Sequence, residues 1–396
     1  MELKLADLFE KTISGEWGVE LKDGEDGVNV IRTTNFTNLG RLNLQDVVKR
    51  NIDVQKYLNK QLEYGDIIIE KSGGSPNQPV GRVVIFEEND KNIYFCNNFT
   101  SILRPKKNMV YSRYALYLLK DLYNKKKVLK YQNKTTGIIN LKLNDYLNGT
   151  LVEIPNIEQQ IKIVEVLDKA QYLIDMRKQQ LDELELLVKS RFIEMFGDPV
   201  SNPKGWEKRK LADECSIITG NTPSRKVDEY YGDYIEWIKS DNITNAGTYL
   251  TTAKEYLSEK GLNVGRSVEQ NSILMTCIAG SLKCIGNVAI ADRKVAFNQQ
   301  INGIETLDNN VFFMFEQFNL SQSYIQSTIN MALKGILSKS QLSELEFIFP
   351  PIELQNEFAN FFKQVDKLKF EMAKSLKELE DNFNSLMQKA FKGELF

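Results

Sequence analysis

Two stretches of the chain carry the regular spacing of apolar residues that is typical of long amphipathic helices. In residues 156–196 apolar side chains recur every seven positions with charged residues between them, which is the repeat of a helix that buries one seam against a partner. In residues 352–392 apolar side chains recur at steps of three and four, which also gathers them on one helix face. The positions that we expect to pair the two helices are Leu167, Ile174, Leu181, Val188, Leu368, Met372, Leu376 and Leu379.

The stretches before the two helices show a different pattern, in which short β-branched runs are separated by Gly and Asn. Residues 67–69 and 83–85 are examples, and such runs predict short strands. The sequence therefore predicts an α+β fold, with two strand-rich globular domains separated by two long helices that form an antiparallel coiled coil. The expected boundaries are a first domain at 1–153, a first helix at 154–198, a second domain at 199–348 and a second helix at 349–396.

The chain also repeats itself. Residues 154–196 align with residues 349–391 without a gap, and Gln160 in the first copy matches Gln355 in the second. The two globular domains echo one another more faintly, with offsets that drift as if the loops differ in length. A repeat of this length fixes the architecture, so we expect an internal pseudo-two-fold arrangement. A shared framework with different loops suits a target made of two parts.

Composition narrows the chemistry that the chain can perform. The 396 residues include no histidine, which removes the commonest general base and the commonest metal ligand. The four cysteines lack the spacing of zinc ligands and no apolar run is long enough to cross a membrane, so a reducing cytoplasm is the expected compartment. We therefore expect no catalytic residues, no metal site and no membrane association.

The net charge of −2 hides an uneven distribution. Residues 101–150 hold eleven Lys and Arg against two acidic residues, a local charge of +9. A basic segment on an acidic background is compatible with binding to nucleic acid, although a solvated helix face explains the charge equally well.

Several short motifs, in a fixed order and duplicated, carry a resemblance to a known family. IPNIEQQ at 154–160 and FPPIELQ at 349–355 open the two helices, FGDP at 196–199 and FKGEL at 391–395 end them, and PKGW at 203–206 leads into the second domain. In this order the chain resembles the DNA specificity subunit of type I restriction-modification systems over nearly its whole length. The segment FCNNF at 95–99 departs from the Asn-Gln pattern that the family uses and that FNQQ at 297–300 retains.

The resemblance implies a non-catalytic subunit of a phage-defence complex in a bacterial or archaeal cytoplasm. Each globular domain would recognise one half of a bipartite site on double-stranded DNA. The helices would bind methyltransferase subunits, two per chain, which carry S-adenosylmethionine and methylate adenine at N6, and a restriction motor-nuclease subunit would join for cleavage. The chain itself would bind no cofactor. In agreement, the only Pro-Pro, at 350–351, lacks the Asn or Asp before it and the aromatic residue after it that hold a flipped adenine, since Phe349 precedes it and Ile352 follows it. No G-x-x-x-x-G-K-[ST] motor loop occurs.

Loops rich in amide, hydroxyl and ammonium groups recur at matching places in both halves, and these groups read base edges. The base-reading candidates are Thr34, Asn35, Ser72, Asn77, Gln78, Asn97, Asn98, Lys239, Asp241, Asn242, Ser281, Lys283, Asn298, Gln299 and Gln300. Any one of these asparagines is more commonly a turn or cap residue. The phosphate-contact candidates are Lys125, Lys126, Lys127, Lys130, Lys134, Arg225 and Lys226.

Three other interpretations stay open at this point. The partner could be a single chain in which methylase and nuclease are fused. The protein could also be a coiled-coil adaptor with two protein-binding domains and no affinity for DNA. An enzyme that uses only carboxylates is the third, and it has only scattered acidic residues in its favour.

Overall fold

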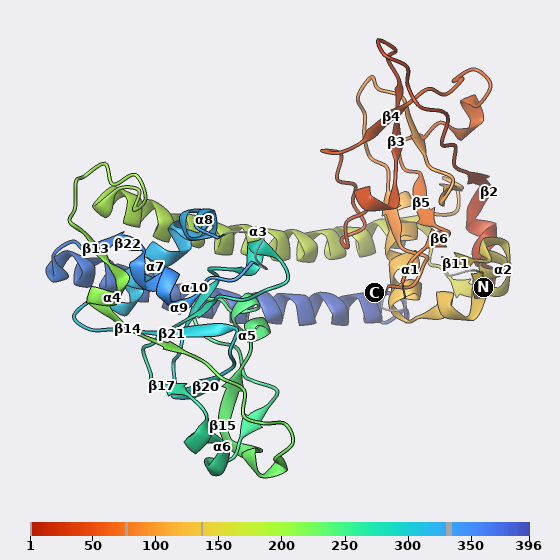
Figure 1. The fold of residues 1–396 in the computed structure, drawn as a ribbon. Coiled ribbons are helices and arrows are strands. Elements are labelled where there is room, and N and C mark those ends of the chain that lie inside the picture. The colour runs from red at the N-terminus through yellow and green to blue at the C-terminus, as the bar shows by residue number, and fades with distance from the viewer. Residues whose placement is uncertain (1, 76–77, 136–137, 330–334) are drawn as a thin grey trace. The chain divides into compact units, whose positions relative to one another are not determined.

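The computed structural model describes residues 2–75, 78–135, 138–329 and 335–396. The chain forms two compact units, of which unit 1 holds residues 1–176 and 376–396 and unit 2 holds residues 177–375. Figure 1 shows the ribbon with its elements labelled. Each unit contains one strand-rich domain and a part of both long helices, α3 (Ile157–Phe196) and α10 (Ile352–Ala390).

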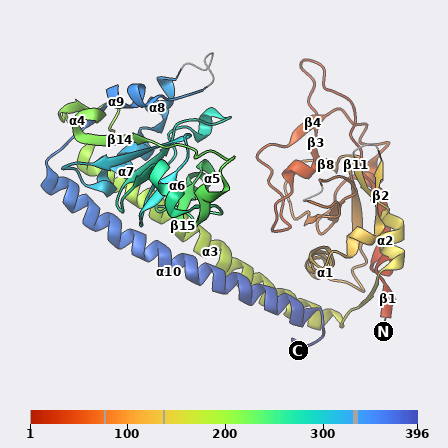
Figure 2. The same cartoon turned by 60° about the horizontal axis from the view of Figure 1, so that its bottom comes forward.

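Unit 1 is built on two small sheets. The first has the order β2-β9-β5-β7 and the second has the order β4-β3-β8. A third sheet of order β10-β11-β6 and the two-stranded pair β1-β12 complete the strands, and both chain termini belong to this unit (Figure 2). Its elements are β1 (Glu2–Lys4), β2 (Phe9–Ser14), β3 (Val28–Ile31), β4 (Val48–Arg50), β5 (Ile67–Glu70), β6 (Ser72–Gly73), β7 (Val83–Ile85), β8 (Tyr94–Cys96), β9 (Thr100–Pro105), α1 (Ser112–Asn124), β10 (Gln132–Thr135), β11 (Ile138–Leu141), α2 (Leu143–Gly149), β12 (Leu151–Glu153) and the short 3-10 turns Leu5–Leu8, Thr33–Asn35, Leu58–Lys60 and Lys127–Tyr131.

Unit 2 repeats this plan. Its sheets have the orders β14-β21-β18-β19 and β16-β15-β20-β17, and β13 pairs with β22. Its elements are β13 (Lys208–Lys210), α4 (Leu211–Glu214), β14 (Cys215–Thr219), β15 (Tyr231–Ile238), α5 (Ser240–Thr244), β16 (Tyr256–Leu257), α6 (Glu259–Val264), β17 (Ser267–Val268), β18 (Ile273–Thr276), β19 (Val288–Ile290), β20 (Val295–Phe297), β21 (Ile301–Thr306), α7 (Val311–Leu320), α8 (Gln322–Ser327), α9 (Lys339–Glu344), β22 (Glu346–Ile348) and the 3-10 turns Asp228–Tyr230 and Leu282–Cys284.

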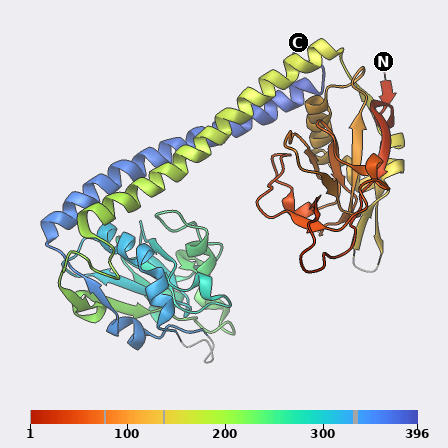
Figure 3. The same cartoon turned by 90° about the horizontal axis from the view of Figure 1, so that it is seen from above.

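The two long helices pack antiparallel in each unit. In unit 1, Leu167 near the start of α3 shares a core with Met387 and Ala390 near the end of α10. In unit 2, Phe192 near the end of α3 meets Phe358 near the start of α10, with ring centroids 5.3 Å apart. Figure 3 shows the two helices side by side. The predicted α+β fold with two strand-rich domains and an antiparallel helix pair is therefore confirmed.

The heptad seam of α3 is largely buried, whereas α10 departs from the predicted stripe at one position. Leu167, Ile174 and Val188 are buried, and Leu181 is half-buried. On α10, Met372, Leu376 and Leu379 are half-buried, but Leu368 is 44% exposed. When apolar residues recur at steps of three and four, they can form two neighbouring stripes along the helix. Leu368 lies on the stripe that faces solvent.

A glutamine side chain fastens the start of each long helix to its domain. Gln160 is fully buried, and its amide donates to the carbonyls of Pro155 and Met109 while its oxygen accepts from the Tyr111 amide at 2.8 Å. This explains why a polar residue is repeated at the root of an amphipathic helix: buried backbone groups need partners.

Gln355 repeats these contacts in unit 2. Its amide donates to Pro350 O at 2.8 Å and Asn309 Oδ1 at 2.9 Å, and its oxygen accepts from the Asn310 amide at 2.9 Å. The repeated motif at 154–160 and 349–355 therefore anchors the start of each long helix to its own domain.

Candidate nucleic-acid interface

In unit 1, parallel strands bring two of the predicted loops to the same sheet edge. β3 and β8 run parallel, with Ile31 opposite Cys96, so the segments that follow them, 33–35 and 97–99, emerge together. The Asn97 amide donates to the Ile31 carbonyl at 2.9 Å. The carboxyl ends of neighbouring parallel strands are a common place for ligand-binding loops.

A third segment is tied to the same edge by a pair of backbone hydrogen bonds. The amides of Lys71 and Ser72 both donate to the Phe99 carbonyl, at 2.9 and 3.1 Å. The Leu141 amide donates to the Lys71 carbonyl at 2.8 Å and adds β11 to the group. We refer to residues 33–35, 71–75, 97–99 and 138–141 as loop cluster 1.

Unit 2 builds the same arrangement with the same backbone contacts. β15 and β20 run parallel with Ile238 opposite Phe297, and the Asn298 amide donates to Ile238 O at 3.1 Å. The amides of Cys277 and Ile278 both donate to the Gln300 carbonyl, at 2.8 and 3.1 Å. The Leu337 amide donates to the Cys277 carbonyl at 2.9 Å and adds a fourth segment. We refer to residues 240–242, 277–284, 298–300 and 335–337 as loop cluster 2.

A glycine directly after β2 in unit 1 and after β14 in unit 2 allows each cluster to close. A Cβ on Gly15 would lie 2.0 Å from the Asn97 carbonyl oxygen, and one on Gly220 would lie 2.1 Å from the Asn298 carbonyl oxygen. No side chain can be accommodated at such a distance from backbone. The close approach is therefore part of the shared framework of both clusters.

Two of the predicted base readers have their amides fully occupied inside the domain. Asn35 is buried, accepts from the Arg32 amide at 2.8 Å and donates to the carbonyls of Asn43 and Asp46. Asn242 is its counterpart: it accepts from the Lys239 amide at 3.0 Å and donates to Thr251 and Thr252. In this conformation both side chains shape the loop and neither faces solvent.

The remaining candidates divide into buried and exposed members. Asn97 and Asn298 are buried, and Ser72 donates to Asn140 Oδ1 at 2.5 Å. Gln300 is half-buried, and its oxygen accepts from the Asn298 amide group at 3.1 Å. Asn77 lies outside the described residues. The exposed candidates, which have the freedom to meet a ligand, are Thr34, Gln78, Asn98, Asp241, Ser281, Lys283 and Gln299.

The charged residue of loop cluster 1 that the sequence analysis missed is Lys71. Its ammonium group donates to Ser14 Oγ at 2.6 Å, and partial burial lowers its pKa. The matching position in loop cluster 2 is Cys277, whose thiol pKa is raised by burial to about 12. The sequence offered no signal for Lys71, because only the backbone contacts reveal that it belongs to the cluster.

Beside loop cluster 2, cations stack on aromatic rings. The guanidinium of Arg225 lies 4.3 Å from the ring centroid of Tyr231, and Lys239 lies 5.1 Å from that of Trp237. Glu255 accepts hydrogen bonds from both cations, first Lys239 and then Arg225, and these contacts lower its pKa. One carboxylate therefore neutralises two of the predicted DNA contacts.

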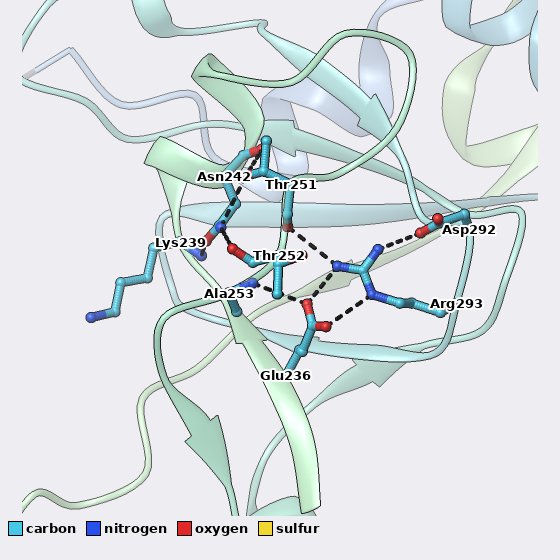
Figure 4. A network of polar contacts seen from close by, with 8 residues as sticks. All are labelled: Glu236, Lys239, Asn242, Thr251, Thr252, Ala253, Asp292 and Arg293. Atoms are coloured by element: carbon cyan, nitrogen blue, oxygen red, sulfur yellow. Dashed lines mark hydrogen bonds and ion pairs between the residues drawn. The ribbon is translucent and has the colours of Figure 1, made fainter. Parts of the chain in front are cut away.

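A second network holds the loop that carries Lys239. Arg293 donates to both carboxylate oxygens of Glu236, at 3.1 and 2.5 Å, and to the Thr251 carbonyl at 3.2 Å. In Figure 4 the guanidinium points at Glu236, while the Lys239 side chain extends away from the network. A bidentate ion pair between Arg293 and Glu236 therefore helps to hold this loop in place.

The basic segment of unit 1 lies mostly on the surface. Lys126, Lys127 and Lys130 are exposed, whereas Lys125 is engaged by Asp121 at 2.7 Å. The side chain of Lys134 is outside the described ones, and Lys226 in unit 2 is exposed. Three of the five lysines predicted to contact phosphates in unit 1 are therefore exposed and outside the Asp121 ion pair, and their contact with DNA stays a prediction.

Within the described residues, no group of three or more His, Cys, Asp or Glu side chains is placed to hold a metal ion. No described helix combines the length and apolar character that a membrane crossing requires.

Comparison with known proteins connects this geometry to a family. The sequence model for the type I restriction modification DNA specificity domain matches residues 1–186 and again residues 203–381. The MjaX specificity subunit of a type I restriction enzyme from Methanocaldococcus jannaschii is 24% identical over 361 residues, which cover 87% of this chain and 80% of that protein. The HindI specificity subunit from Haemophilus influenzae is 31% identical over 159 residues, 38% of this chain and 33% of that protein.

Solved structures show the same fold. A chain from a study of complex assembly and conformational transition of the type I R-M system superposes with a TM-score of 0.60 at 16% identity, covering 100% of this chain and 98% of that chain. The type I S subunit from M. genitalium superposes with a TM-score of 0.58 at 14% identity, covering 99% and 96%. With both halves matched by the family's model, this chain belongs to the type I restriction modification DNA specificity family.

Proposed function

We propose that the chain is the sequence-reading subunit of a DNA adenine-N6 methyltransferase and type I endonuclease complex. Each unit reads one half of a bipartite site on double-stranded DNA through its loop cluster. The observation that carries this proposal is the identical backbone framework of the two clusters, with the paired amides on one carbonyl in each. A backbone framework that occurs twice indicates that the two units have the same kind of role, here the recognition of two different targets.

The side chains that the two frameworks display are different, as two readers require. Lys71 is matched by Cys277, Thr34 by Asp241 and Asn98 by Gln299. An ammonium group favours guanine edges, an amide favours adenine, and a carboxylate accepts from cytosine. The two units are therefore expected to prefer different half-site sequences.

The surface lysines of the segment 126–130 would position the DNA without specifying its sequence. With Lys125 and Lys134, five lysines are available for phosphates in this stretch. Neutralising about five phosphates gives a slope near −4.5 for log affinity against log salt. A slope close to zero would favour an adaptor that does not bind DNA.

The helix pair offers apolar surface to partner proteins. Leu186 and Phe370 in unit 2 are 60% and 69% exposed, and Tyr172 in unit 1 is 61% exposed. Large apolar side chains that are exposed on both long helices suit a contact with another protein. We assign this surface to methyltransferase subunits, two per chain, which carry S-adenosylmethionine; a restriction motor-nuclease subunit then joins, as a separate chain or fused to the methylase.

The test is methyl transfer with separated components. Labelled S-adenosylmethionine and DNA are incubated with this chain alone, with the methyltransferase subunit alone and with the mixture. We expect transfer at one bipartite sequence from the mixture only. Transfer by this chain alone would contradict a non-catalytic role, and site-specific transfer by the methyltransferase subunit alone would show that the specificity lies elsewhere.

A further inference from the structure

A cavity in unit 2 has no explanation in the proposed DNA function. It has a volume of about 520 Å³ and lies between α7, the segment that follows α5, and the unit 2 portions of α3 and α10. Small-molecule sites in proteins are commonly concave spaces of about 300–1,000 Å³. Its lining includes Glu316, Asn319, Gly247 and Asp366.

Glu316 is the unusual member of this lining. Its side chain is 4% exposed, and its Oε1 atom is buried without a hydrogen-bond partner. Burial raises the pKa of this carboxyl. A buried carboxylate with one oxygen left without a hydrogen bond is costly and needs an explanation.

The internal repeat supplies the comparison that identifies what is missing. The Tyr111 amide of unit 1 and the Asn310 amide of unit 2 make the same hydrogen bond, to Gln160 and Gln355, at the starts of α1 and α7. Counting from these matched residues, Glu316 takes the place of Tyr117 and Asn319 takes the place of Lys120.

In unit 1 these positions hold a buried tyrosine and a half-buried lysine. The Lys120 ammonium donates to the Leu39 carbonyl at 2.8 Å, and burial lowers its pKa to about 8. Tyr117 donates to Asp168 at 2.7 Å. Unit 1 thus carries a primary ammonium group between its α1 helix and the loop that contains Leu39.

Unit 2 has lost that ammonium group and the bulk around it. The loop that contains Leu39 can be matched to its counterpart in unit 2 by one backbone hydrogen bond. The Ile85 amide donates to the Gly40 carbonyl and the Ile290 amide donates to the Thr248 carbonyl. Gly40 therefore corresponds to Thr248, and the preceding residue Leu39 corresponds to Gly247. A Cβ on Gly247 would meet nothing within 4 Å. Asn319 is too short to replace the lysine, and a carboxylate now faces the space.

The other charges of the lining are engaged or exposed. Lys369 pairs with Glu185 at 3.2 Å, and Asp366 accepts from the Thr248 hydroxyl at 2.6 Å. Lys189 on α3 is exposed and makes no hydrogen bond to the buried oxygen of Glu316. Among the described residues, the Oε1 atom of Glu316 therefore remains without a hydrogen bond, although the Asn319 side chain bonds to this carboxylate and Lys189 and Lys369 attract its charge.

We propose that this cavity binds the primary ammonium group of a small, free aliphatic amine, which replaces the lysine that unit 1 carries in its own chain. Glu316 accepts a charge-assisted hydrogen bond from the ammonium group, and Asn319 and the Gly247 carbonyl complete the site. Charge-assisted pairs are the stronger class of hydrogen bond, and the apolar part of the cavity receives the alkyl chain.

The test uses the full chain and n-butylammonium chloride, with sodium chloride at the same ionic strength as the reference. Calorimetric titration should show saturable binding, and the melting temperature should rise with amine but not with sodium. Glu316→Gln should weaken binding by about tenfold or more, because it removes one charge-assisted hydrogen bond. Glu371→Gln, an exposed acid elsewhere on α10, is the matched control and should bind like the unchanged protein.

Asn319→Lys introduces the residue that unit 1 has at the matching position, Lys120. This second variant tests the proposal independently if Glu316→Gln does not fold. It should melt at a higher temperature than the unchanged chain without amine, and it should no longer respond to amine. The proposal is overturned if n-butylammonium and sodium act alike on the unchanged chain, or if Glu316→Gln binds the amine as well as Glu371→Gln does.

Discussion

Among single residues, the glutamine at the root of each long helix has the clearest structural role. Replacing Gln355 with Ala would remove three hydrogen bonds and leave the Asn310 amide and the Pro350 carbonyl without this partner. We expect a loss of about 2–4 kcal/mol in the free energy of unfolding, since buried groups left unsatisfied cost about 1–3 kcal/mol each. Urea unfolding measures this change, and Gln364→Ala, an exposed glutamine of the same helix, should change the free energy by less than about 0.5 kcal/mol.

Glu316 gives a prediction on pH. Its folded pKa is raised above the ordinary value of 4.5 by burial, so ionisation weakens the folded state as pH rises through the raised pKa. Lys189, Lys369 and Glu185 face it from α3 and α10, and burial outweighs the two lysines. In amine-free buffer, Glu316→Gln should match the unchanged chain near pH 4 and become the more stable of the two as pH rises to 8. Equal stability curves across that range would contradict the raised pKa of the buried Glu316 carboxyl.

The fate of the amide-rich candidates shows what sequence reveals at the residue scale. Asn35 and Asn242 were selected as base readers because their chemistry fits, yet their burial and their bonds to neighbouring carbonyls tie them to the loop. Composition cannot distinguish an amide that satisfies its own backbone from one that faces a ligand. Their assignment as direct base readers stays a prediction, and the exposed Asn98 and Gln299 are the better positions to mutate first.

Among the elements, β2 and β14 are each followed by a glycine that allows the loop cluster of their unit to close. Gly220→Ala would bring a Cβ to 2.1 Å from the Asn298 carbonyl oxygen, so the loop must move. We expect reduced affinity for DNA that carries the half-site of unit 2, with the preference of unit 1 unchanged, in methylation assays on half-site variants. Gly247→Ala, which lies outside loop cluster 2 and where a Cβ would meet nothing within 4 Å, controls for stability. Equal loss at both half-sites would show that the clusters do not act separately.

The solvent-facing stripe of the helices tests partner binding. Phe370→Ser should leave the melting temperature of the chain nearly unchanged, because this side chain is 69% exposed. It should weaken assembly with the methyltransferase subunit by at least about tenfold if the ring is buried on binding, as loss of a large apolar contact implies. Analytical ultracentrifugation of the mixture measures the effect, with Lys367→Ser as an exposed control on the same helix. Unchanged assembly would move the docking surface elsewhere.

At this scale the sequence was a reliable guide. Period-seven spacing predicted a helix over 156–196, and the structure has α3 at Ile157–Phe196. The second helix was predicted at 352–392 and is found at Ile352–Ala390. Leu368 is the exception: its spacing fits the stripe, but which of two neighbouring stripes faces the partner helix depends on packing that periodicity does not contain. Likewise, the convergence of four loop segments depends on strand pairing between distant residues.

For the molecule as a whole, the internal repeat is the feature from which the proposed function follows. The order of the sheet β2-β9-β5-β7, repeated as β14-β21-β18-β19, the parallel strand pair, the glycine approach and the glutamine contacts all occur twice. The proposed boundaries at 153, 198 and 348 stay predictions, since the compact units instead divide each long helix along its length. Two complete frameworks with different exposed side chains imply two independent readers.

The most direct measurement of that claim is a domain exchange followed by mapping of methylated adenines. Residues 206–348 are replaced by the equivalent region of a relative with a different site, and the complex is assembled with its methyltransferase subunit. The account predicts that one half of the methylated sequence changes to that of the relative while the other half stays the same. A change in both halves, or in neither, would contradict it.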